Sequence, residues 1–293
     1  MPVFSKLIEL ARPVELLLAA LCYALGLGVG RYLGQTNDIF VAFLGLLILL
    51  LLLSAARLLE AYFRFPPETF FEEDSRSRNE SFRRALLNTA LVLLGLAALF
   101  ASLMGFRALL NPVAVLFMLA ALMTSMAFAV PPLRLIDRGF GEFALALLMG
   151  AFAPALAYSL QSGELHRLLM LVALPLFALA LAGLLAFDFP DYAADLKRGR
   201  RTMLIRLTWQ RAIPTHNLLL AAAYLLFAAS AFMGLSLALI WPAFLTLPLA
   251  AYQVFMLTRI SDGAKPVWPA LKVNAAAIFG LTAYLLTLTF WLR

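Results

Sequence analysis

Residues 188–202 read DFPDYAADLKRGRRT and directly follow the apolar run RLLMLVALPLFALALAGLLAF of residues 167–187. An apolar run of about 20 residues predicts a helix that crosses a membrane. The polar stretch then carries Asp188, Asp191 and Asp195 at the spacings i, i+3 and i+7. On a helix these spacings place the three carboxylates on one face, where they repel each other unless a cation lies between them. The stretch therefore predicts a polar site at the end of a membrane helix.

Four basic residues follow these aspartates at once: Lys197, Arg198, Arg200 and Arg201, around Gly199. Carboxylate oxygens are ligands that Mg²⁺ prefers, and proteins usually share Mg²⁺ with a phosphate group. The neighbouring acids and bases therefore predict a membrane-embedded site for a diphosphate and Mg²⁺. The same pattern also fits a helix end whose aspartates pair with nearby bases, and the residues alone leave both interpretations open.

The composition indicates a polytopic membrane protein. The chain has 293 residues, of which 64% are hydrophobic and 13% are charged, whereas about a quarter of the residues of a soluble domain are charged. The mean hydropathy is +0.93. No segment alternates in the way that a strand of a membrane β-barrel does, so the predicted fold class is all-α. The net charge of +7 comes from bases between apolar runs, which indicates membrane orientation and not binding of nucleic acid.

Nine apolar runs are long enough to span a membrane. They cover residues 15–34, 38–60, 85–106, 111–130, 140–161, 167–187, 213–235, 237–257 and 268–291. We expect one domain over residues 1–293, built as a bundle of nine transmembrane helices around a central cavity. With the amino end placed inside, 19 of the 23 basic residues fall on the inner side. The positive-inside rule thus predicts a cytoplasmic amino end and an outer carboxyl end.

The stretch DFPDYAADLKRGRRTMLIRL of residues 188–207 resembles the second aspartate motif of the UbiA superfamily of membrane prenyltransferases. That motif runs D-x-x-x-D, then a Gly-Lys/Arg-x-Thr turn and an Arg-Leu pair. The loop VPPLRLIDRGFGE of residues 130–142 is similar to the family's P-P-x-R-L-K-x-x-G-x-G-E. The matching residues are Arg12-Pro13, Pro131, Pro132, Arg134, Leu135, Gly139, Gly141, Glu142, Asp191, Asp195, Gly199, Arg200, Thr202, Arg206 and Leu207.

The resemblance implies transfer of an isoprenoid chain from a prenyl diphosphate to an aromatic acceptor, such as a quinone precursor, in a cavity open to membrane lipid. It also implies Mg²⁺ as cofactor, held on the diphosphate by two aspartate-rich motifs. Asp191 and Asp195 would be metal ligands and catalytic residues, and Asp188 could assist them. The implied phosphate contacts are Lys197, Arg200 and Arg201 from this loop and Arg134 from the neighbouring loop.

The first aspartate motif of the family, N-D-x-x-D-x-x-x-D, is eroded here. Its place reads LLEAYFRFPPE, residues 58–68. Glu60 stands where Asn is expected, Ala61 and Arg64 replace the first two aspartates, and Glu68 keeps the third acidic position. An alanine cannot bind a metal ion, and an arginine repels one.

Three interpretations of this loss stay open. A rearranged site could take metal ligands from Glu60, Glu68 or the acidic residues 72–74. A metal-poor site could use Arg64 as a fixed cation for the diphosphate, because guanidinium groups bind phosphate well. A chain that keeps the fold without the chemistry would instead bind lipid, quinone or pigment, or act as a subunit of a membrane complex.

The prediction is therefore a multi-pass prenyltransferase of a bacterial or archaeal cell membrane, with the non-catalytic homologue as the alternative. A transporter is disfavoured, because the charged residues gather in loops and not at mid-membrane.

Overall fold

The computed structural model describes residues 3–64 and 76–293, and within these ranges it contains helices and no strands. The helices are α1 (Val3–Leu10), α2 (Pro13–Tyr32), α3 (Ile39–Tyr62), α4 (Arg76–Phe106), α5 (Pro112–Ala129), η1 (Leu135–Arg138), α6 (Gly141–Ala146), η2 (Leu147–Phe152), α7 (Ala153–Ser162), α8 (Arg167–Asp188), η3 (Phe189–Asp191), α9 (Tyr192–Lys197), α10 (Met203–Phe232), α11 (Leu237–Ile240), η4 (Trp241–Thr246), α12 (Leu247–Ser261) and α13 (Trp268–Leu292).

Nine helical segments in the described ranges are long and apolar enough to cross a membrane, which confirms the predicted fold class. The segment Gly141–Ser162 joins α6, η2 and α7, and the segment Leu237–Ser261 joins α11, η4 and α12. The main difference from the prediction is α10, which begins ten residues before residue 213. Its first turns are polar and basic, so a count of apolar residues does not detect them.

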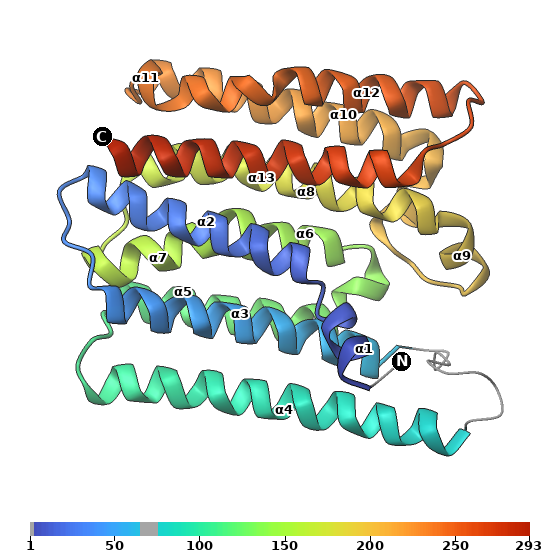
Figure 1. The fold of residues 1–293 in the computed structure, drawn as a ribbon, viewed down its shortest axis with the longest axis horizontal. Helices are drawn as coiled ribbons and strands as arrows, with labels where there is room; N and C mark the ends of the chain where they lie inside the picture. The colour runs from blue at the N-terminus through green and yellow to red at the C-terminus, as the bar shows by residue number, and fades with distance from the viewer. Residues whose placement is uncertain (1–2, 65–75) are drawn as a thin grey trace.

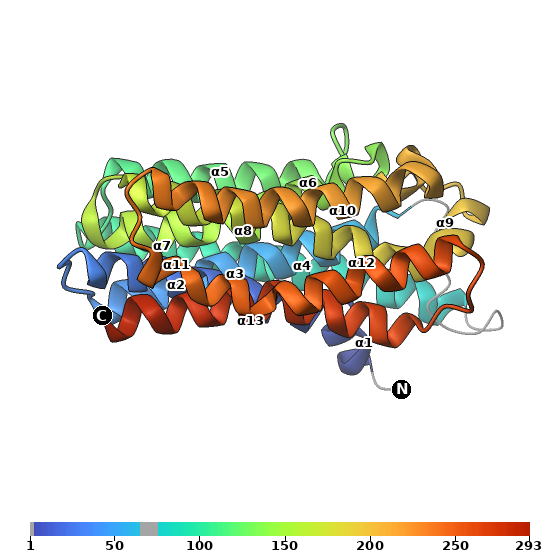
Figure 2. The same cartoon turned by 90° about the horizontal axis from the view of Figure 1, so that it is seen from above.

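The long helices run side by side along one axis of the molecule (Figure 1). In both views α1 and α9 lie at one end of the bundle, and the carboxyl end of α13 lies at the other (Figure 2). Helix α2 packs against α7 and α13, and α8 packs against α10 and α13. An odd number of spans accounts for the position of the two chain ends at opposite ends of the bundle.

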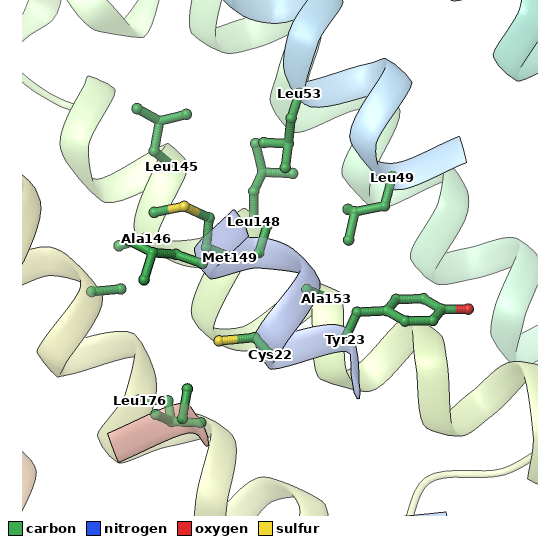
Figure 3. Packing of buried hydrophobic residues seen from close by; sticks show 14 of the residues in the cluster. Cys22, Tyr23, Leu49, Leu53, Leu145, Ala146, Leu148, Met149, Ala153 and Leu176 are labelled. Carbon is green, nitrogen blue, oxygen red and sulfur yellow. The ribbon is translucent and has the colours of Figure 1, made fainter. Parts of the chain in front are cut away.

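The core lies between α2, α3, α7 and α8, where Cys22 and Tyr23 pack among leucine and alanine side chains (Figure 3). Helix α2 approaches α7 closely at Gly26. A Cβ atom at this position would lie less than 3.0 Å from the backbone carbonyl group of Pro154. Gly26 therefore allows the two helices to pack at short distance, as small residues commonly do in membrane bundles.

Candidate active site

A polar pocket lies at the end of the bundle that carries α1 and α9. It brings together six carboxylates and four arginines from segments that are distant in sequence. The lining residues are Arg12, Arg57, Glu60, Arg64, Ile136, Asp137, Glu142, Leu145, Leu184, Asp188, Asp191, Asp195, Arg200 and Thr202. The structure thus places Asp188, Asp191, Asp195 and Arg200 of the second motif opposite Glu60 and Arg64 of the first.

The three aspartates do not lie on one continuous helix. Helix α8 ends at Asp188, the 3₁₀ turn η3 follows it with Pro190 inside, and α9 starts at Tyr192. Proline has no backbone N–H and disturbs a regular α-helix, which accounts for the change of helix type. All three carboxylates nevertheless line the same pocket, so the spacing predicted their common location through a different local structure.

The loop after α9 folds back over the pocket. Gly199 has a φ of +67°, a conformation that glycine adopts at little steric cost. The next residue then turns inward, and Arg200 Nη1 donates to Asp195 Oδ1 at 2.9 Å. The side chain of Asp195 is only 6% exposed. In contrast, the Asp191 side chain is 61% exposed and faces Lys272 Nζ at 3.6 Å.

On the opposite wall, Glu60 is already engaged. Its two carboxylate oxygens accept hydrogen bonds from Arg64, with nitrogen–oxygen distances of 2.8, 3.0 and 3.1 Å. Ala61 is buried beside it. The arginine that replaces an expected aspartate is thus held in the pocket by a neighbour one helical turn away.

A buried ion-pair network next to this wall was not predicted. Arg57 donates to both oxygens of Glu15, at 2.8 Å from Nε and 2.5 Å from Nη2. Arg12 donates to the same carboxylate at 3.1 Å. The network ties α2 to α3 and presents two guanidinium groups to the pocket. The sequence does carry a signal for it, because Glu15 and Arg57 are charged residues within or next to apolar runs.

Glu142 connects the two motif loops that the resemblance identified. The backbone N–H of Met203, at the start of α10, donates to Glu142 Oε1 at 3.2 Å. The other oxygen, Oε2, is buried and has no hydrogen-bond partner, and the same is true of Asp188 Oδ2. Arg206 adds a second connection, because its guanidinium lies 5.0 Å from the centre of the Phe140 ring.

Three of the implied phosphate contacts are not among the lining residues. Lys197 and Arg201 are exposed on the loop after Asp195. Arg134 donates to the backbone carbonyl of Phe63 and forms an ion pair with Asp137 at 2.9 Å. Partial burial raises the pKa of the Asp137 carboxyl, and the nearby Arg134 opposes that rise. Glu68 and residues 72–74, named above as possible metal ligands, lie outside the described residues.

The donor set of the pocket fits a hard divalent cation. Within residues 3–64 and 76–293 no group of three or more Asp, Glu, His or Cys residues is arranged to hold a metal ion. Mg²⁺, however, commonly binds through one or two protein carboxylates and completes its shell with water and phosphate oxygens. The buried, unpartnered oxygens of Asp188 and Glu142 show that coordination capacity is present in the pocket.

A second, more apolar hollow lies beside the polar pocket, between the start of α2 and α13. Arg12 and Asp191 line both, so the two are adjacent. The other residues of this hollow are Pro13, Val14, Glu15, Phe187, Lys272, Val273 and Ala276. A polar site for an anion therefore borders a space suited to hydrocarbon.

Comparison with known proteins identifies the family. The sequence model of the UbiA prenyltransferase family matches residues 71–276, which is more than half of the chain. Among the curated proteins no match is found.

Solved structures of UbiA homologues share the fold over almost the whole chain. A homologue from Archaeoglobus fulgidus bound to DMAPP and Mg²⁺ is 19% identical, with a TM-score of 0.60 and coverage of 96% of this chain and 99% of the homologue. The same homologue bound to GPP and Mg²⁺ gives a TM-score of 0.62 at the same identity and coverage. A digeranylgeranylglyceryl phosphate synthase is 15% identical, with a TM-score of 0.57 and coverage of 100% and 98%. This protein is an integral membrane protein that belongs to the UbiA prenyltransferase family.

Proposed function

We propose that this protein transfers an isoprenoid chain from a prenyl diphosphate to an aromatic acceptor within the membrane. The observation that carries the proposal is the polar pocket, where carboxylates and arginines from both motif regions face one another at one end of a membrane bundle. Charged groups of both signs in such a position suit a polyanion together with a divalent cation. The structures of a homologue bound to DMAPP or GPP with Mg²⁺ support this assignment.

In the proposed reaction the bond between the allylic carbon and the diphosphate oxygen breaks, and its electron pair remains on that oxygen. The allylic carbon then bonds to the acceptor, which releases a proton. Negative charge grows on the leaving diphosphate, so fixed positive groups around it lower the barrier. Arg200 and Arg64 are the arginines proposed for this role, and Lys197, Arg201 and Arg134 remain predicted phosphate contacts from the adjoining loops.

Mg²⁺ would be held by Asp191 and Asp195, with assistance from Asp188. When bound, the ion supplies positive charge that neutralises the diphosphate oxygens. The apolar hollow that borders the pocket at Arg12 and Asp191 would receive the hydrophobic part of a substrate or the acceptor ring. An aromatic acceptor of the quinone-precursor type is the proposed partner of the prenyl diphosphate.

A second candidate function is that of a non-catalytic homologue that binds lipid, quinone or pigment, or serves as a subunit of a membrane complex. One observation favours it: both oxygens of Glu60 are engaged by Arg64, and Ala61 has no carboxylate. The wall that carries the first motif therefore offers fewer metal ligands than the family pattern.

One experiment separates the two candidates. The purified protein is incubated with geranyl diphosphate, Mg²⁺ and a panel of phenolic acceptors, and pyrophosphate release is followed together with the formation of prenylated product. Turnover that depends on both acceptor and Mg²⁺ is the expected result. Absence of turnover, together with absence of Mg²⁺-dependent binding of the diphosphate, would reject the enzyme and favour the non-catalytic homologue.

We also propose that the amino end and the polar pocket face the cytoplasm, as the distribution of basic residues predicts. The single native cysteine, Cys22, is buried, so introduced cysteines can report the two sides separately. Cys replacing Arg107, in the loop after α4, should react with a membrane-impermeant maleimide in intact cells. Cys replacing Lys265, in the loop before α13, should react only after the cells are permeabilised. The opposite labelling pattern would contradict the proposed orientation.

A further inference from the structure

We infer that Glu142, together with Asp188, forms an inner binding site for a divalent cation in the polar pocket. This inference rests on the proposed function, because the cation would accompany the diphosphate. It assigns a role to a residue outside the two aspartate motifs. It also places the free metal-binding capacity of this chain on the wall formed by α6 and α8, and not on the wall that carries Glu60 and Arg64.

The first argument comes from the partners of the outer carboxylates. Glu60 accepts three contacts from Arg64. Asp137 faces Arg134 Nε at 2.9 Å. A metal ion at either of these groups would first have to break an ion pair and would then lie close to an arginine, which repels it.

The second motif shows the same engagement to a lesser degree. Asp195 Oδ1 accepts from Arg200 at 2.9 Å, and Asp191 Oδ2 faces Lys272 at 3.6 Å. Asp188 differs from both, since its Oδ2 is buried without a hydrogen-bond partner. The cations that act on Asp188 are Arg12 and Arg57, and both donate to Glu15.

The second argument comes from Glu142 itself. This residue is 4% exposed and lines the pocket, and its Oε2 has no partner. A buried carboxylate oxygen without a hydrogen bond is costly, and most buried polar atoms are therefore partnered. Glu142 also acts on Asp188 more strongly than any other charged group does. Two neighbouring carboxyl groups with unpartnered oxygens are stabilised by a cation between them.

The third argument concerns preorganisation. Glu142 Oε1 is held by the N–H of Met203 at 3.2 Å. This hydrogen bond orients the carboxylate and leaves Oε2 directed to the pocket, as outer hydrogen bonds commonly do for metal ligands. Water and diphosphate oxygens would complete the coordination shell, which suits Mg²⁺ or Mn²⁺.

The test uses the full chain in detergent and Mn²⁺ alone as the probe, with free Mn²⁺ measured by electron paramagnetic resonance. Glu142→Gln removes the charge but keeps an oxygen that can accept from Met203. We expect this variant to raise the Kd of Mn²⁺ about 10-fold or more, and Asp188→Asn to do the same. Glu142→Asp keeps the charge on a shorter side chain, so its Kd should lie between those of the wild type and Glu142→Gln.

Two matched variants remove pocket carboxylates that already have a partner. Glu60→Gln and Asp137→Asn should each leave the Mn²⁺ affinity within about twofold of the wild type. An unchanged affinity in Glu142→Gln, or a larger loss in Glu60→Gln, would overturn the inference while prenyl transfer could still be observed. Absence of pyrophosphate release in a protein that binds Mn²⁺ through Glu142 would instead reject the proposed function alone. A thermal unfolding curve for each variant separates loss of the site from loss of the fold.

Discussion

Replacing both Asp191 and Asp195 by asparagine should lower kcat/KM for pyrophosphate release by at least about 10³-fold. Both carboxylates line the pocket, and the proposed reaction develops its charge on the diphosphate that they would help to position through Mg²⁺. Asparagine keeps the size of the side chain and removes the negative charge, so the loss would report electrostatics and not packing. Steady-state kinetics with geranyl diphosphate and a phenolic acceptor would measure the effect.

Asp262→Asn is the matched control for this pair. Asp262 is exposed after α12 and does not line the pocket. Its substitution should leave kcat/KM within about twofold, because isolated surface charges contribute little. If the Asp191 and Asp195 double variant kept more than a tenth of wild-type activity, these aspartates would not hold the metal ion, and their place in the proposed function would have to be abandoned.

Arg64→Ala should raise the Kd of the prenyl diphosphate about 10- to 100-fold, since hydrogen bonds from a charged group contribute about 1.5–3 kcal/mol. Arg64→Asp should weaken binding further, because it adds a second carboxylate beside Glu60 and repels the diphosphate. Equilibrium binding of a fluorescent prenyl diphosphate analogue in the presence of Mg²⁺ would measure both variants.

Arg259→Ala serves as the comparison for Arg64, because Arg259 is an exposed arginine outside the pocket near the end of α12. Its effect on the diphosphate Kd should remain within about twofold. Tighter binding by Arg64→Asp would show that the position still acts as a metal ligand site and that the arginine inhibits it. That result would favour the non-catalytic homologue over the enzyme.

Much of the fold follows from the sequence, because a membrane helix has a simple physical signature. Nine apolar runs of sufficient length predict nine spans, and the described residues contain nine such helices. The ends of the helices are harder to predict. Helix α10 starts at Met203 with polar turns, and a non-helical residue at Thr208 interrupts it. Hydropathy does not register a helical turn that lies outside the apolar layer.

The candidate site is partly predictable for a different reason. The spacing of Asp188, Asp191 and Asp195 depends only on local chain geometry, so it can be read from the sequence. The meeting of Glu142 with Asp188, and of Arg57 with Glu15, depends on how distant helices pack. Each of these residues is visible as a charge near an apolar run, but its partner is set by tertiary contacts between α2, α3, α6 and α8.

The ion pair between Asp195 and Arg200 has a consequence for the order in which ligands bind. In the unliganded pocket each group satisfies the other at 2.9 Å. A diphosphate that attracts Arg200 loosens its hold on Asp195 and makes that carboxylate a better metal ligand. A divalent cation at Asp195 likewise releases Arg200 for the phosphate oxygens. Because linkage between two binding events is reciprocal, cation and diphosphate should raise each other's affinity by the same factor, and the pocket would fill cooperatively.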